Sequence, residues 1–189
     1  MSGNLYVCGF KDKIPEGVKV VDTTSKSKSP FSPFLSGCRT PLRANRMENA
    51  WQYSKVYEMH DDNGKPKSSW YKWRMMGFNK FWADRYPMGK GQVPLYTWFN
   101  DQPLSYIEAR KALYVPLYRD MLMSTAAQYQ INNIISQLKR TDVYLKDFDG
   151  YNEPEKTFEE ILNDPDKKMG HAFVLREVIR EKIENAEQK

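Results

Sequence analysis

The chain contains two kinds of hydrophobic pattern: short apolar runs typical of strands, and apolar residues at helical spacing. Two runs near the N-terminus, Leu5–Cys8 and Val18–Val21, are rich in residues that favour strands. The turn-forming stretch Pro15-Glu16-Gly17 separates them, so we expect two strands that pair or lie side by side. Val143–Leu145 has the same character and predicts a further short strand.

Most of the remaining chain repeats its apolar residues every three or four positions, which predicts helices. The helices are expected over residues 45–57, 70–81, 106–118 and 125–138, with a last one from about 169 to 184. Pro116 should kink or end the third, and Thr157 with Glu160 predicts a capping box for a short additional helix. We therefore predict one helix-dominated α+β domain over residues 1–189, with a strand- and loop-rich part at 1–44 and a charged tail at 180–189.

An aromatic stripe, Trp70, Trp73, Gly77 and Phe81, falls at helical spacing in the second predicted helix. A stripe of this kind either packs into a core or stacks on nucleic-acid bases. We interpret it as core, because one apolar face of an amphipathic helix is normally buried.

Charge favours polyanionic partners, since the formal net charge is +5 and the pI is near 9.0. Lysines are spread along the chain without a zinc-finger, basic-zipper or helix-turn-helix pattern, so a solvated basic surface is an equal alternative to nucleic-acid binding. Neither a membrane span nor a signal peptide is evident, and we expect a cytoplasmic protein. Cys8 and Cys38 should be free thiols, and we expect no metal and no cofactor.

The segment Asn45–Tyr57 carries the most specific chemistry. As a helix it places Glu48, Gln52 and Lys55 on one face, with Trp51 beside them. An acid, an amide and an amine next to an aromatic ring suit a polar ligand. Alternatively, Asn45 caps the helix and Glu48 completes a capping box, which leaves the other two polar residues in solvent.

Three further places carry polar candidates. Arg85 and Lys90 belong to a glycine-containing loop that suits a phosphate, although its spacing is not that of a P-loop. Asp147 and Asp149 would point the same way in an extended loop. His171, at the start of the last helix, is interpreted as structural, with a general acid as the alternative.

The pattern Glu48-x-x-x-Gln52-x-x-Lys55, with an aromatic residue at 51, resembles the central helix of the NADAR family. Two more segments match in the same order. Phe31–Gly37 is similar to the segment that opens that family's ligand pocket, and Gly170–Val178 is similar to its C-terminal helix. Pro33 replaces the family's asparagine, which removes an amide side chain and a backbone donor. The chain also resembles phage and bacterial proteins with these elements, which implies a divergent branch.

The resemblance implies a NADAR-like fold and an N-glycoside hydrolase. Members of that family split an N-glycosidic bond, and a carboxylate can stabilise the oxocarbenium-like transition state or activate water. It implies catalytic roles for Glu48 and for Asp149 or Asp147. The substrate-binding residues that it implies are Ser32, Phe34, Ser36, Trp51, Gln52, Lys55, Arg85 and Lys90.

The expected reaction is removal of ADP-ribose from a nucleobase of modified DNA, as a phage countermeasure against a DNA-modifying toxin. One alternative is a glycosylase that acts on another modified base or a small nucleotide. The other is a non-enzymatic phage protein that binds nucleic acid or a host defence factor.

Overall fold

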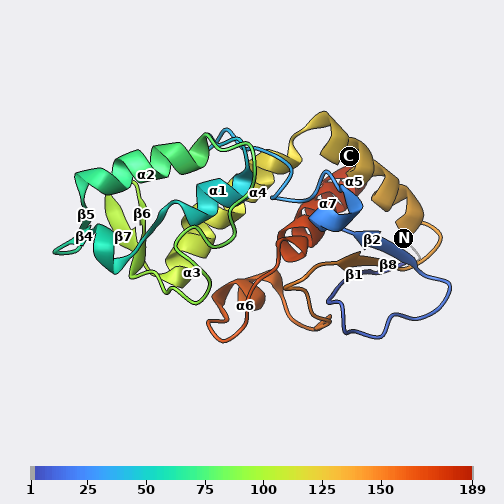
Figure 1. Ribbon diagram of the computed structural model, residues 1–189. Helices are drawn as coiled ribbons and strands as arrows, with labels where there is room; N and C mark the ends of the chain where they lie inside the picture. Colours follow the sequence, from blue (N-terminus) through green and yellow to red (C-terminus); the bar gives the residue numbers. More distant parts are fainter. Residues whose placement is uncertain (1–2, 189) are drawn as a thin grey trace. The chain divides into compact units, whose positions relative to one another are not determined.

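A computed structural model describes residues 3–188, and the chain forms two compact units (Figure 1). Unit 1 combines Met1–Ser32 with Leu122–Lys189, and unit 2 is Pro33–Met121. About 41% of the chain is helix and 15% is strand, which confirms the predicted α+β class and the excess of helix. No helix in residues 3–188 is long and apolar enough to cross a membrane.

Unit 1 is built on a parallel sheet of order β1-β8-β2. Both β1 (Leu5–Cys8) and β2 (Lys19–Asp22) pair with β8 (Val143–Lys146). Tyr144 is the register partner of Tyr6 on one side and of Val20 on the other. The prediction that the first two strands lie side by side is wrong, because β8, whose first three residues are buried, occupies the central position.

Three helices and a short 3₁₀ turn complete unit 1: η1 (Ser25–Ser27), α5 (Thr125–Leu138), α6 (Phe158–Asn163) and α7 (His171–Glu187). The predicted capping box of α6 is confirmed: Thr157 and Glu160 exchange side-chain and backbone hydrogen bonds. The first six residues of α7 are all buried. Because α7 extends to Glu187, much of the predicted charged tail is helical.

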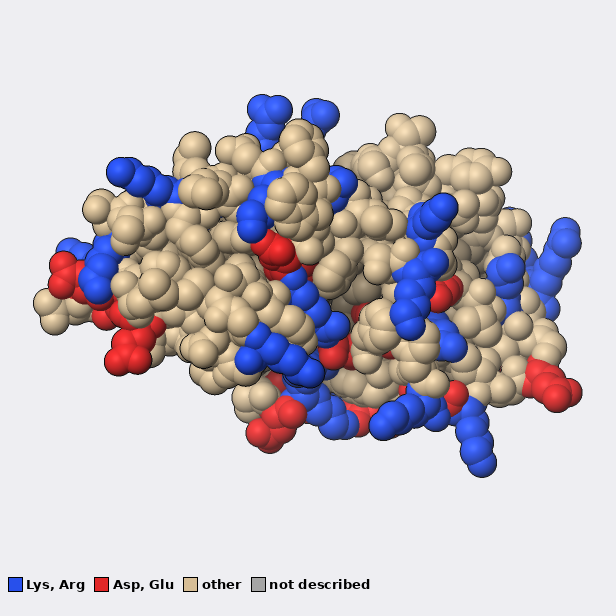
Figure 2. Space-filling model, in the orientation of Figure 1, with Lys and Arg blue, Asp and Glu red and all other residues tan. Residues whose placement is uncertain are grey.

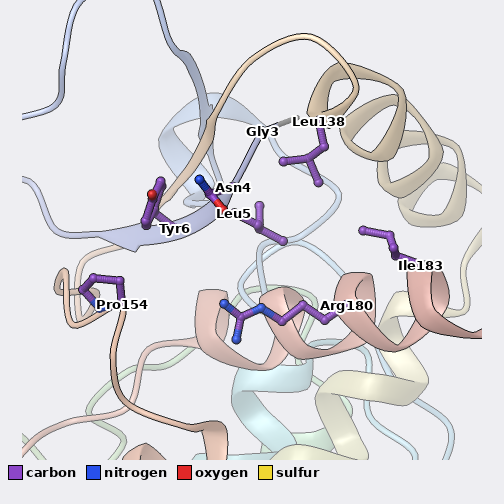
Figure 3. Close-up of a pocket in the computed structure, with 8 residues that line it drawn as sticks. All are labelled: Gly3, Asn4, Leu5, Tyr6, Leu138, Pro154, Arg180 and Ile183. Carbon is purple, nitrogen blue, oxygen red and sulfur yellow. The ribbon is translucent and has the colours of Figure 1, made fainter. Parts of the chain in front are cut away.

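A hollow of about 340 Å³ lies beside β1 and α7 within unit 1 (Figure 3). Its lining residues are Gly3, Asn4, Leu5, Tyr6, Leu138, Pro154, Arg180 and Ile183. Arg180 is the one charged side chain among them. None of the site residues predicted from the sequence lines this hollow, so it is not the candidate site.

Unit 2 contains two small antiparallel sheets, of order β3-β6-β7 and β4-β5, together with several helices. Its elements are α1 (Met47–Gln52), β3 (Lys55–Val56), the 3₁₀ turn η2 (Glu58–His60), β4 (Asp61–Asp62), β5 (Lys65–Pro66), α2 (Ser68–Phe78), β6 (Tyr96–Phe99), β7 (Gln102–Leu104), α3 (Tyr106–Ala109), the π-helical turn η3 (Arg110–Tyr114) and α4 (Val115–Leu122). Val56, Trp70 and Trp98 form a buried cluster that joins α2 to the larger sheet.

Two helices of unit 2 end earlier than predicted. The helix expected over residues 45–57 stops at Gln52, and Lys55 begins β3 instead. The helix expected over 70–81 stops at Phe78, so the aromatic stripe loses its last member. Trp70 is buried as predicted, whereas Phe81 is 74% exposed and the prediction that it belongs to the core is wrong.

Pro116 does not end its helix. The helical run continues to Leu122, with the π turn η3 immediately before α4. A proline has no amide for the carbonyl four residues earlier, and its ring crowds that carbonyl. The π turn η3, which is wider than an α-helical turn, ends two residues before Pro116. We therefore attribute this turn to the proline.

Candidate functional site

Backbone carbonyls from the preceding loop cap the N-terminus of α1. The Met47 amide donates to the Ser36 carbonyl at 2.8 Å, and the Glu48 amide donates to the Pro33 carbonyl at 3.0 Å. The free amides of a helix N-terminus need such acceptors. The segment predicted to open the ligand pocket therefore holds the start of α1 through its main chain.

The predicted capping box is absent from this helix. Arg46 occupies the cap position, and no side chain accepts a hydrogen bond there. The Asn45 side-chain amide donates to the Asn79 carbonyl at 2.7 Å instead. The capping-box prediction is wrong because main-chain carbonyls already bind these amides, so the Glu48 carboxylate is not needed as a cap.

Glu48, Gln52 and Lys55 form a continuous chain of side-chain hydrogen bonds, called here the Glu48 chain. Gln52 Nε2 donates to Glu48 Oε1 at 2.8 Å, and Lys55 Nζ donates to Gln52 Oε1 at 2.7 Å. Glu48 is buried at 6% exposure, and the other two side chains are partly buried. An amide that donates to the acid and accepts from the amine fixes the order of the three groups.

Lys55 is electrostatically unusual. Burial lowers the pKa of its amine to about 8, and the nearby Glu48 carboxylate opposes this shift in part. The amine is therefore mostly charged at neutral pH but loses its proton just above it. An amine of this kind can hold an anion or transfer a proton.

An aromatic wall lies beside the Glu48 chain. The Lys55 ammonium is 5.0 Å from the Trp51 ring centroid, and Tyr114 meets that ring edge-on with centroids 5.1 Å apart. The Tyr106 ring centroid is 6.4 Å from that of Trp51, and Arg110 Nη2 donates to the Tyr106 hydroxyl at 3.1 Å. Arg110 and Tyr114 belong to the π turn, a distortion frequent at functional sites.

The structure does not gather all the predicted binding residues around Glu48. Phe34 and Ser36 belong to the loop that caps α1, whereas Ser32 is buried at the end of unit 1. Arg85 is partly buried in the loop after α2. Lys90 is exposed, and within residues 3–188 no hydrogen bond or ring contact joins it to the Glu48 chain.

Asp147 and His171 form a second buried polar cluster, in unit 1. Asp147 Oδ2 accepts the Ala172 amide at 3.1 Å and lies 3.2 Å from His171 Nδ1. His171 Nε2 lies 3.0 Å from the Thr23 carbonyl. Both ring nitrogens therefore face oxygen atoms that can accept hydrogen bonds. These contacts tie the ends of β2 and β8 to α7 and support a structural role for His171 and Asp147.

Asp149, two residues further along, is partly buried, and its carbonyl accepts the Gly170 amide at 3.2 Å. Gly170 precedes α7 and packs closely, since a Cβ there would lie 2.3 Å from Asp147 Oδ2. The loop that carries the two aspartates is therefore fixed against the start of α7. Both aspartates belong to unit 1, whereas Glu48 belongs to unit 2.

The two cysteines are free, as predicted, and both are buried. Burial raises the pKa of the Cys8 thiol to about 11 and that of Cys38 to about 12. A thiol nucleophile needs a lowered pKa, so neither cysteine suits nucleophilic catalysis. In the part of the chain that the structure describes, no cluster of three or more His, Cys, Asp or Glu residues is arranged to hold a metal ion.

The sequence model of the protein family DUF6939, a family of unknown function, matches residues 7–175 of the chain. Comparisons with curated proteins and with solved structures give no match.

Proposed function

The chain belongs to the DUF6939 family, whose function is unknown, and we propose that it is an N-glycoside hydrolase that removes ADP-ribose from a nucleobase of modified DNA. The observation that carries the proposal is the Glu48 chain, a buried carboxylate linked through one amide to a desolvated amine. The reaction class comes from the resemblance to NADAR proteins. Such an activity would serve a phage against a toxin that modifies DNA.

Glu48 has the chemistry that this reaction needs. When the bond between the anomeric carbon and the base nitrogen breaks, its electron pair leaves with the base and positive charge builds on the ribose. A buried carboxylate stabilises that charge strongly, because little water screens it. The same carboxylate can accept a proton from the water whose oxygen bonds to the anomeric carbon, and this proton can then pass to the nitrogen of the departing base.

The neighbours of Glu48 suit the remainder of the substrate. Protonated Lys55 can bind a phosphate or ribose oxygen, and Gln52 holds the acid and the amine in their relative positions. Trp51 is only 7% exposed, so its ring packs against Lys55 and Tyr114 and offers little surface to a base. Tyr106 is 47% exposed, and we assign the stacking role to it.

The burial of Glu48 favours an enzyme over a simple binding module. A module that uses only its surface would leave this carboxylate in solvent as a helix cap, whereas it is buried and linked to Lys55. A glycosylase for another modified base would use the same residues and differ only in substrate. Asp149 remains a proposed second carboxylate, and the proposal does not depend on it.

The test incubates the protein with ADP-ribosylated single-stranded DNA and follows free ADP-ribose by mass spectrometry. We expect release by the wild type and a rate at least roughly a hundredfold lower for Glu48→Gln, which keeps an oxygen to accept the Gln52 hydrogen bond. Glu58→Gln, the same substitution at an exposed glutamate of unit 2, is the matched control and should retain the full rate.

Each outcome has a separate meaning. Unchanged substrate with well-folded wild-type protein would refute the proposed reaction. Release by Glu48→Gln at the wild-type rate would keep the reaction class and reject Glu48 as its catalytic residue. Release of a small nucleotide product, with ADP-ribosylated DNA untouched, would favour the alternative glycosylase.

A further inference from the structure

The loop that follows α2 exposes two large aromatic side chains. Phe81 is 74% exposed and Trp82 is 62% exposed. Apolar surface left in water costs a free energy of about 25 cal/mol per Å², so large exposed rings are unfavourable unless they have a use. An adjacent pair therefore indicates a binding surface when the backbone that carries it is held in place.

One buried side chain fixes this loop to the helix that carries Glu48. Asn49 is fully buried, and its amide donates to the carbonyls of Gly77 at 3.1 Å and Trp82 at 2.9 Å. Its oxygen accepts the Asp84 amide at 2.8 Å. Two of these hydrogen bonds hold the loop backbone at Trp82 and Asp84, and the third holds Gly77 near the end of α2.

A second anchor involves the side chain of Asp84. Its carboxylate accepts a hydrogen bond from the Tyr53 hydroxyl at 2.6 Å and pairs with the Lys80 ammonium at 2.5 Å. Lys80 also donates to the Tyr53 hydroxyl at 2.7 Å. The loop is thus fixed by its polar groups, while its two aromatic side chains project into solvent.

Cations alternate with these rings. The Lys80 ammonium lies 5.7 Å from a Trp82 ring centroid, and the Arg85 guanidinium lies 5.7 Å from that of Tyr86. Over residues 70–92 the sequence has five basic residues against one acid, Asp84. Figure 2 shows Lys and Arg side chains projecting over α2. This composition complements a polyanion that carries flat rings.

We propose that the Phe81–Trp82 loop, residues 79–86, binds single-stranded nucleic acid, with bases stacked on Phe81 and Trp82 and phosphates near Lys80 and Arg85. Aromatic stacking and a basic groove are the usual means of binding single strands without sequence preference. The inference rests on the proposed function for its purpose, which is to hold the strand that carries the modified base. Asn49 lies next to Glu48 on α1, so both features belong to one anchored part of unit 2.

A protein partner is the competing occupant, because Met75 and Met76 on α2 are also exposed, at 63% and 69%. Methionine-rich surfaces suit apolar peptides. The interleaved cations favour nucleic acid, since an apolar peptide has no phosphate for them to neutralise.

The probe is an unmodified, fluorescein-labelled single-stranded DNA of roughly 15 nucleotides, the upper end of known site sizes. Fluorescence anisotropy measures its binding to the full chain. We expect wild-type binding that weakens as salt rises, and an affinity at least roughly tenfold lower for the double variant Phe81→Ala/Trp82→Ala. Tyr129→Ala, at a 63% exposed aromatic residue of α5, should bind like the wild type.

Phe81→Tyr/Trp82→Tyr keeps both aromatic faces and should retain most of the affinity, which excludes a mere loss of fold. Absence of DNA binding by the wild type, or equal binding by wild type and Phe81→Ala/Trp82→Ala, would overturn the inference. Glu58→Gln, at an exposed glutamate of unit 2 outside both proposed sites, should bind unmodified DNA like the wild type. Binding without hydrolysis would therefore reject only the proposed function, and hydrolysis without a role for the loop would reject only this inference.

Discussion

Two buried polar clusters among residues 3–188, the Glu48 chain in unit 2 and the Asp147–His171 pair in unit 1, differ in what their side chains contact. In unit 2, Glu48, Gln52 and Lys55 bond to one another through their side chains. In unit 1, Asp147 and His171 meet main-chain groups as well as each other. Contacts with the main chain fix loops and helix ends, whereas a chain of side chains keeps an acid and an amine together without fixing the backbone.

This difference separates structural from chemical roles among residues of the same type. Both Glu48 and Asp147 are buried carboxylates that contact a nitrogen-bearing side chain, the Gln52 amide in one case and the His171 ring in the other. Asp147 accepts a hydrogen bond from the Ala172 amide in the first turn of α7 and faces His171, so the loss of its carboxylate should weaken the fold. Glu48 is tied to Gln52, and its isosteric amide can keep that contact. The same kind of substitution should therefore mainly lower the stability of the fold at Asp147 and mainly lower the reaction rate at Glu48.

The largest expected effect on stability is at Asp147. Asp147→Asn weakens the contacts of this carboxylate with the Ala172 amide and with His171, and we expect a loss of roughly 3 kcal/mol in the free energy of unfolding. Glu48→Gln should cost less, because the new amide oxygen keeps the hydrogen bond from Gln52 and Gln52 separates position 48 from Lys55. Urea denaturation followed by circular dichroism measures both. Equal losses at the two sites would erase the distinction between them.

Lys55 makes a smaller, pH-dependent contribution. Its pKa is about 8 in the folded protein and near 10.5 when exposed, so between these values the unfolded chain binds a proton that the folded chain lacks. Stability should therefore rise with pH, by roughly 2 kcal/mol from about pH 8 to pH 10. Below about pH 8 both states are protonated, and the cost of burying the charge is fully present.

The measurement compares wild type with Lys55→Met by urea denaturation at both pH values. The buried thiols of Cys8 and Cys38 have raised pKa values and titrate with the opposite sign, but they are common to both proteins. The difference in unfolding free energy should therefore shift by about 2 kcal/mol in favour of the wild type. A difference that stays constant would mean that Lys55 is not desolvated.

Gln52 should have the smallest effect. Gln52→Ala removes the amide that links Glu48 to Lys55, and we expect the rate of ADP-ribose release to fall about tenfold, or about 1.4 kcal/mol in activation free energy. Gln102→Ala, at an exposed glutamine of β7, is the matched control. An undiminished rate for Gln52→Ala would show that the amide has no role in positioning the acid.

Sequence reasoning found the Glu48 chain because its members are close neighbours along the chain. The helix ends at Gln52, earlier than predicted, yet Lys55 still reaches Gln52 from β3. Long flexible side chains tolerate such an error in a helix boundary. The α+β class was accessible for the same reason, since it depends on local periodicity.

Features that depend on contacts between distant parts of the chain could not be predicted from the sequence. Nothing near Leu5 or Val20 in the sequence indicates that a strand from residues 143–146 separates them. The cap of α1 consists of the Pro33 and Ser36 carbonyls, and main-chain acceptors leave no mark on residue type. The helical pattern continued to Phe81 although the helix had ended, so an exposed ring was predicted as core.

The most direct test measures ADP-ribose release by Glu48→Gln and Asp147→Asn in one assay, with each rate divided by the folded fraction of that variant. We expect Asp147→Asn to keep a corrected rate within a few-fold of the wild type, and Glu48→Gln to fall by roughly a hundredfold or more. A corrected rate that collapses for Asp147→Asn and survives for Glu48→Gln would contradict the assignment of chemistry to unit 2 and of structure to unit 1.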